Sequence, residues 1–213
     1  MLNDGFESLY GLDGPVNMRI GLGYAATDRM VVTLARSNVL DNVDLNLKYR
    51  AFELDNGSLP VLVAFFGGIS WTTEDVFGRS RGNSRNFQYY VMAVANTMFE
   101  DRVALGVAPA YLYNSNIFSQ DYEDIFILGS YVQVYVSELL SFMMEWSPAI
   151  SNNDPNYNSA SVGFELETGG HFFKIFASNS TMLNPSQYLS GSAYEFKSDE
   201  LRLGFMITRI LKF

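Results

Sequence analysis

Apolar and polar residues alternate along most of this chain with a period of two, which is the period of a β-strand. Residues 43–52 give the clearest case. There the odd-numbered positions from Val43 to Ala51 are apolar or aromatic, and the even-numbered positions from Asp44 to Arg50 are charged or carry an amide. A helix would not sort side chains in this way. The pattern predicts a strand with one apolar face and one polar face.

Ten further segments show the same alternation, or are long apolar runs bounded by turn residues. They are residues 16–25, 30–37, 61–71, 87–98, 103–113, 125–136, 140–147, 160–167, 172–178 and 200–213. We therefore expect eleven strands in an all-β chain. In residues 87–98 and 125–136 apolar side chains occupy both phases, so the pattern leaves their facing open.

The connections between these segments alternate between short and long. The short connections are residues 26–28, 55–58, 99–101, 137–139 and 168–170, and the longer ones are residues 38–42, 72–85, 114–124, 151–158 and 179–199. Transmembrane β-barrels have short turns on the periplasmic rim and longer loops on the other. We therefore predict a transmembrane, antiparallel, up-and-down β-barrel of about twelve strands. The predicted lipid-facing belt contains Val16, Leu22, Leu45, Leu47, Val63, Val107, Phe164, Ile175, Leu203 and Ile207.

Eleven is an odd number of strands, whereas bacterial single-chain barrels close with an even number. Counting back from a periplasmic C-terminus places residues 3–14 on the side of the long loops. The sequence therefore predicts that one further strand precedes Met1. A partner chain, or direct pairing of residues 16–25 with residues 200–213, would be the alternative ways to close the sheet.

Composition supports one membrane-embedded domain spanning residues 1–213. The chain is 48% hydrophobic and 17% charged, yet its mean hydropathy is +0.03, so apolar residues are interleaved with polar ones. The longest apolar run, residues 59–69, contains Pro60 and two glycines and is too short for a spanning helix. A net charge of −9 argues against a nucleic-acid partner.

Charged side chains on the predicted inner faces are the candidate functional residues, as the lining of the lumen. They are Arg19, Asp44, Lys48, Arg50, Glu145, Glu165, Glu167, Lys174 and Arg202. Two interpretations remain open. The charges could form an internal salt-bridge network, because buried charges persist when paired, or they could form a charge-selective constriction.

Other candidate chemistry is sparse, and we expect no enzymatic activity, cofactor or metal. Cysteine is absent, and His171 is the only histidine; it adjoins a predicted turn, where capping a hairpin is the simpler role. The acidic residues 119–124 lack the spacing of a calcium loop, so a solvated loop is expected. Residues 184–189 predict one helical turn beginning at Pro185, too short to plug a pore alone.

The C-terminal segment ends on an aromatic residue preceded by apolar residues in one phase. Phe205, Ile207, Leu211 and Phe213 share that phase. This arrangement resembles the signal by which the barrel-assembly machinery recognises its substrates.

Several segments together resemble an uncharacterised Bacteroidota family of outer-membrane β-barrels, known only as a domain of unknown function. The segments are YGLDG, YAATDRMVVTLARS, SVGFELETGGHFFKIFASNS and LGFMITRILKF. The most specific elements are residues 167–171 and 178–180. The resemblance implies a barrel in the outer membrane of a Gram-negative bacterium, with another strand before the YGLDG-like loop, and it implies no substrate.

Two functions are compatible with these observations. The first is a small porin-like channel for polar solutes, and the second is a non-conducting barrel that anchors or scaffolds a larger outer-membrane complex. Expected partners are outer-membrane lipid and lipopolysaccharide, the barrel-assembly machinery and, in the second case, other subunits of such a complex.

Overall fold

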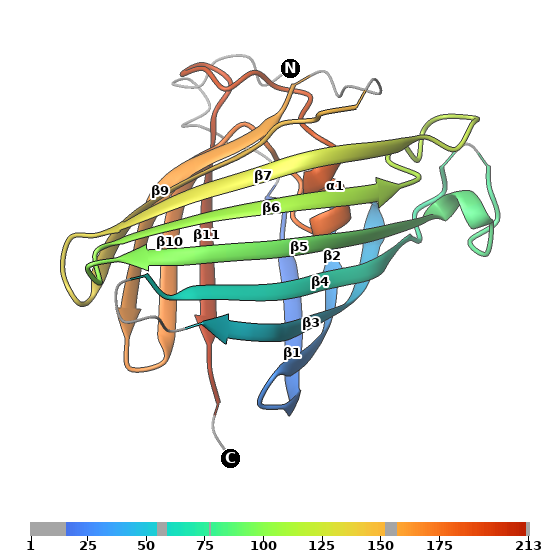
Figure 1. Ribbon diagram of the computed structural model, residues 1–213. Coiled ribbons are helices and arrows are strands. Elements are labelled where there is room, and N and C mark those ends of the chain that lie inside the picture. Colours follow the sequence, from blue (N-terminus) through green and yellow to red (C-terminus); the bar gives the residue numbers. More distant parts are fainter. Residues whose placement is uncertain (1–15, 55–58, 77, 152–156, 212–213) are drawn as a thin grey trace.

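The computed structural model describes residues 16–54, 59–76, 78–151 and 157–211. These residues form one antiparallel sheet of eleven strands, in which each strand pairs with its neighbours in the sequence (Figure 1). The sheet curls around an interior, so the fold is the predicted up-and-down barrel. The strands are β1 (Arg19–Thr27), β2 (Met30–Ser37), β3 (Asn42–Leu54), β4 (Val61–Thr72), β5 (Phe87–Phe99), β6 (Val103–Tyr113), β7 (Asp124–Tyr135), β8 (Leu140–Ser147), β9 (Ser159–Thr168), β10 (His171–Ser178) and β11 (Arg202–Arg209).

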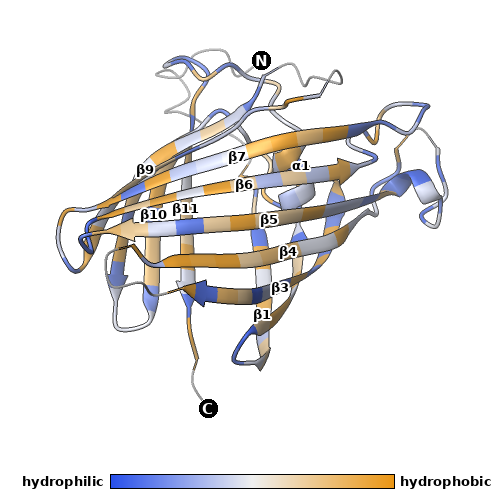
Figure 2. Cartoon of the chain, viewed as in Figure 1, coloured by the Kyte–Doolittle hydropathy of each residue, from blue (hydrophilic) through white to orange (hydrophobic). Residues whose placement is uncertain are grey.

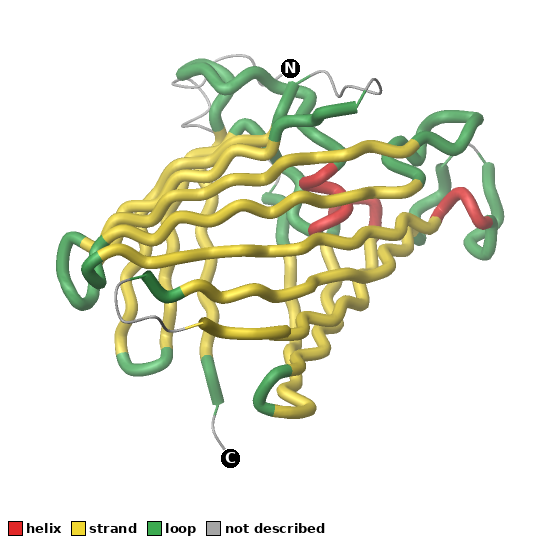
Figure 3. The backbone as a smooth tube through the Cα atoms, viewed as in Figure 1, coloured by secondary structure: helices red, strands yellow, loops and turns green. Residues whose placement is uncertain are grey.

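The connections lie alternately at the two ends of the strands, as Figure 3 shows, and the long ones share one end as predicted. The exception in length is the β2–β3 connection, residues 38–41, which is no longer than the β7–β8 turn at the other end. The β9–β10 turn consists of Gly169 and Gly170, both with positive φ. Tight hairpins require such backbone angles, which glycine adopts without steric cost. At the other end, three connections contain a helical turn: η2 (Val39–Asp41), η3 (Ser84–Asn86) and α1 (Pro185–Leu189).

The outer face of the barrel carries exposed hydrophobic side chains at alternate positions. Leu22, Val107 and Ile175 have exposed fractions of 77%, 49% and 59%. Figure 2 shows hydrophobic stretches along the strands and hydrophilic residues at the turns. Such a continuous apolar surface is stable when lipid hydrocarbon covers it. Among the described residues, no helix is long and apolar enough to cross a bilayer.

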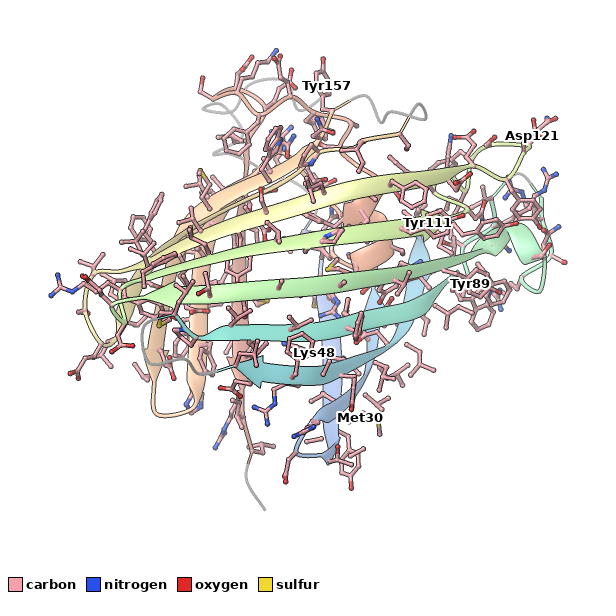
Figure 4. All side chains as sticks on the ribbon, in the orientation of Figure 1. Met30, Lys48, Tyr89, Tyr111, Asp121 and Tyr157 are labelled. Carbon is pink, nitrogen blue, oxygen red and sulfur yellow. The ribbon has the colours of Figure 1, made fainter. Side chains whose placement is uncertain are left out.

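Aromatic residues gather on the outer face near the end with the long connections. Trp71 stacks on Phe87, with ring centroids 5.8 Å apart, and Tyr111 packs on Phe126 at 4.8 Å. Figure 4 shows Tyr89 and Tyr111 near that end of their strands. This is the arrangement of an aromatic girdle at a membrane interface.

The first and last strands are the two edges of the described sheet, because pairing is present between all sequence neighbours but not between β1 and β11. The predicted loop at residues 3–14 lies outside the described residues, as does any strand before Met1. The last strand is shorter than the predicted residues 200–213, since it begins at Arg202 and ends at Arg209. Glu200 is instead held in a turn, where its carboxylate lies 2.9 Å from the Lys197 ammonium.

Candidate functional site: the lumen of the barrel

The strand register places the charged residues proposed to line the lumen on the inner face of the sheet. Lys174 of β10 pairs with Glu165 of β9, and Arg50 of β3 pairs with Ala64 of β4, which is only 1% exposed. The residues on this face are Arg19, Asp44, Lys48, Arg50, Glu145, Glu165, Glu167, Lys174 and Arg202.

The lumen is closed at the end with the long connections and accessible to water at the end with the short turns. Along β3, inward-facing Asn42 and Asp44 have no exposed surface, and Asn46 is 5% exposed. The next two inward-facing side chains, Lys48 and Arg50, are exposed. Figure 4 shows Lys48 along β3. The interior therefore has two halves with different environments.

Residues 179–201 connect β10 to β11, and we call them the plug segment. Its residues 179–192 fill the closed half, whereas residues 195–199 are exposed. Helix α1 lies inside the barrel behind β5 and β6 in Figure 1. Its first residue is Pro185, and the backbone N–H of Asn184 before it donates to Gln187 Oε1 at 3.4 Å. Asn184 and Ser186 have no exposed surface. The prediction of one helical turn is confirmed, and the turn does not fill the lumen alone, because the flanking residues enter the lumen with it.

Polar side chains hold the plug segment against the wall from several directions. Asn184 is central, since its Oδ1 accepts from Arg19 Nε at 2.8 Å and its Nδ2 donates to Asn42 Oδ1 at 2.6 Å. Further hydrogen bonds run from Gln187 Nε2 to Val39 O (3.0 Å), from Ser159 Oγ to Tyr188 O (2.8 Å) and from Gln88 Nε2 to Ser190 Oγ (3.4 Å). One cation and several neutral amides and hydroxyls thus fix the segment to β1, β3, β5 and β9.

Leu189 is the apolar anchor of the plug segment. It is 5% exposed and packs into a cluster on the inner wall of β5, β6 and β7. The wall residues of this cluster are Tyr90, Ala110, Leu112, Ile125 and Ile127. The cluster explains why apolar residues occupy both phases of β5 and β7: one phase faces lipid, and part of the other faces the plug.

Asp44 is a fully buried carboxylate beneath the plug segment. It accepts hydrogen bonds from Ser70 Oγ at 2.6 Å, from the Tyr90 hydroxyl at 3.0 Å and from Asn46 Nδ2 at 2.5 Å. A buried charge needs such donors to persist. Tyr90 therefore links the polar network around Asp44 to the apolar cluster that holds Leu189.

The phenol of Tyr188 lies near the boundary between the two halves. Burial raises its pKa, and the nearby Glu145 carboxylate raises it further. The Tyr188 hydroxyl and Ser186 Oγ are buried without a hydrogen-bond partner in the part of the chain that the structure describes. The phenol is consequently kept in its neutral form.

The charged residues of the accessible half are only partly paired. Lys174 Nζ lies 2.9 Å from Glu165 Oε2, and Arg50 Nη1 lies 3.8 Å from Glu53 Oε2, where both side chains are exposed. In the closed half, Arg19 contacts the neutral amide of Asn184. The salt-bridge network expected from the sequence is therefore limited, since neutral donors satisfy much of the buried charge.

The remaining candidate residues make contacts outside the two networks described above. The His171 ring is on the outer face, parallel to Phe173 with centroids 6.1 Å apart. Arg202 stacks over Tyr194 at 4.8 Å. Phe205 and Ile207 face outward on β11, Leu211 follows that strand, and Phe213 lies outside the described residues. Within the described ranges, no group of acidic or histidine residues could hold a metal ion.

The sequence analysis missed the residues that hold the plug segment, above all Asn184, Gln187 and Leu189. The available signal was the motif at residues 184–189, in which an asparagine precedes a proline and a glutamine. That signal predicts a local turn. It carries no information about the wall residues, which are distant in the sequence.

A sheet that curls around an interior, an apolar outer surface and up-and-down connections define the class: this chain is a membrane β-barrel with a porin-like fold. Residues 1–211 match the family described as a membrane-bound β-barrel domain (DUF5777), and the chain belongs to that family. Among curated protein sequences, none matches it. A solved structure described as the NanC porin is similar over 92% of this chain and 93% of its own, with a TM-score of 0.63 and 10% identity. That similarity concerns the fold alone.

Proposed function

We propose that this chain is an outer-membrane channel for small polar solutes, and that the plug segment closes its lumen in the state described. One observation carries the proposal: the inward-facing side chains of β3 change from fully buried to exposed along the strand. The long connections face the outside of the cell in this proposal, and the accessible half opens to the periplasm.

The width of the barrel supports this proposal. About eight strands enclose an interior that side chains fill, whereas a larger number leaves room for more. Here the chain fills the additional space with a separate segment attached through neutral hydrogen bonds, one hydrogen bond from Arg19 and one leucine. Such a segment can leave the lumen without breaking the sheet.

A non-conducting barrel that anchors an outer-membrane complex is the second candidate. The complete burial of Asn184 and Ser186 favours it, because these residues would have to be rehydrated during opening. The two candidates differ in whether a displaced plug segment leaves a conducting pathway.

Conductance in a planar lipid bilayer tests the proposal. The purified protein is compared with Leu189→Asp, which places a carboxylate in the apolar cluster, and with the matched control Phe196→Asp, at a 44% exposed position of the same segment. We expect low conductance for the unmodified protein and for Phe196→Asp, and open channels for Leu189→Asp. If all three barrels are silent while their β-sheet circular dichroism is intact, the second candidate is correct.

A further inference from the structure

The accessible half of the lumen contains a pocket in the wall formed by β7, β8 and β10. Its volume is about 270 Å³, close to the lower limit of about 300 Å³ for small-molecule sites. The inward-facing side chains that line it are Tyr131, Gln133, Met143, Glu145 and Lys174. Of these side chains, Glu145 also lies beside the Tyr188 phenol of the plug segment.

The pocket carries one uncompensated negative charge. Lys174 is paired with Glu165 at 2.9 Å, so these two charges balance. Glu145 Oε1 accepts a hydrogen bond from Ser161 Oγ at 2.7 Å. Throughout the described residues, no basic side chain lies within ion-pairing distance of Glu145. Its neighbours, Ser161 and the Tyr188 phenol, are neutral, so a positively charged ligand can pair with its carboxylate.

Tyr131 adds an aromatic surface beside this carboxylate. Tyr131 is the cross-strand partner of Gly106 on one side and of Glu145 on the other. A Cβ atom added to Gly106 would collide with Cε1 of the Tyr131 ring, so the ring rests directly on the glycine backbone. The ring is thus held against β6, and it also lines the pocket.

The side-chain amide of Gln133 gives the pocket a hydrogen-bond acceptor. Gln133 Nε2 donates to Ser141 Oγ and to Glu165 Oε1, both at 2.8 Å. Both N–H bonds of the amide are thereby used, and the carbonyl oxygen is left to accept. The pocket thus combines a carboxylate, an amide oxygen, the thioether of Met143 and an aromatic face.

From this combination we infer that the pocket is a binding site for a small organic cation of the ammonium class. Carboxylates and aromatic faces both attract ammonium groups, and a thioether tolerates their alkyl substituents. The inference does not depend on conduction, because a site in the accessible half can be occupied while the plug segment is closed.

Isothermal titration calorimetry on the full chain in detergent tests this inference, with choline as the probe. The comparison ligand is 3,3-dimethylbutan-1-ol, which has the same shape without the charge. We expect choline to bind with one-to-one stoichiometry and the neutral alcohol to bind at least about tenfold more weakly. Binding should weaken about tenfold or more in Glu145→Gln, which keeps the acceptor for Ser161, and about two- to thirtyfold in Tyr131→Leu.

Glu167→Gln is the matched control, because Glu167 is an exposed inward-facing carboxylate on β9 that does not line the pocket. Its affinity for choline should equal that of the unmodified protein. Equal affinities for choline and the alcohol, equal losses in the two glutamine variants, or no heat of binding would each overturn the inference. A barrel that binds choline but is silent in the bilayer would refute only the proposed channel.

Discussion

The substitution Leu189→Ala tests whether the plug segment is held reversibly in the lumen. Leu189 is 5% exposed and contacts an apolar cluster that contains Tyr90, Leu112 and Ile127. Replacing a buried leucine by alanine costs about 2–5 kcal/mol, because apolar contacts are lost and a cavity remains. If the cost falls on the closed state alone, the open population rises between about 30-fold and about 4,000-fold.

Thiol labelling measures this population. The chain contains no cysteine, so Ser186→Cys introduces a single reporter at a position with no exposed surface. Ser186 Oγ has no hydrogen-bond partner among the described residues, so the reporter removes no side-chain hydrogen bond. When opening and closing are fast relative to labelling, the rate of modification by a maleimide is proportional to the open population. The rate should therefore increase by the same factor in the Leu189→Ala background.

Phe196→Ala is the matched control, because Phe196 belongs to the same segment and is 44% exposed. Its labelling rate should change by no more than about twofold. A weak dependence of the rate on urea would show that the opening is local and not global unfolding. An unchanged rate in Leu189→Ala would refute the argument that this leucine anchors the segment.

Three further predictions concern the wall and the boundary of the lumen. Leu47→Arg should destabilise the barrel in lipid vesicles by about 2–4 kcal/mol in urea titrations if Leu47 lies near the bilayer centre; unchanged stability would mean that this face is not in lipid. Glu165→Gln should lower the free energy of unfolding by about 1–3 kcal/mol in the same assay, because it leaves the Lys174 ammonium half-buried and unpaired. Adding Lys174→Met should recover most of this stability, and no recovery would contradict the pairing argument. Burial raises the pKa of Tyr188, so the contribution of its neutral phenol to closure is complete below the unfolded value of about 10 and is lost as the pH rises above it. The labelling rate of the Ser186→Cys reporter, corrected for thiol ionisation, should therefore rise more steeply above that pH than it does in the Tyr188→Phe background. Parallel pH profiles in the two backgrounds would show that the phenol does not contribute to closure.

The strands could be predicted because lipid imposes a local rule on each of them. Between Val43 and Ala51 every second residue must be compatible with hydrocarbon, so the sequence itself records the facing. In residues 87–98 and 125–136 this rule does not determine which side chains face the lipid, because both phases are apolar. Tyr90, Ile125 and Ile127 are apolar because they receive Leu189, and the sequence does not indicate which of two apolar phases faces the plug.

The plug segment could not be predicted because its contacts are far apart in the sequence. Asn184 and Asn42 are separated by 142 positions, yet their side chains are hydrogen-bonded. Local propensity correctly predicts a helical turn that begins at Pro185, but it does not reveal whether that turn lies in solvent or in a lumen. The length of the connection was informative only after the sheet had been shown to enclose an interior.

The chemistry of the two halves indicates why closure by this segment can be reversible. Breaking a buried ion pair costs about 3–5 kcal/mol, because the remaining charge is left without a partner. A neutral hydrogen bond contributes only about 0.5–1.5 kcal/mol net, since water replaces the lost partner. Gln187 and Tyr188 contact the wall through neutral groups, whereas the buried carboxylate of Asp44 is satisfied by wall residues alone. Withdrawal of the plug segment would thus expose the Asp44 network to water without removing any of its donors.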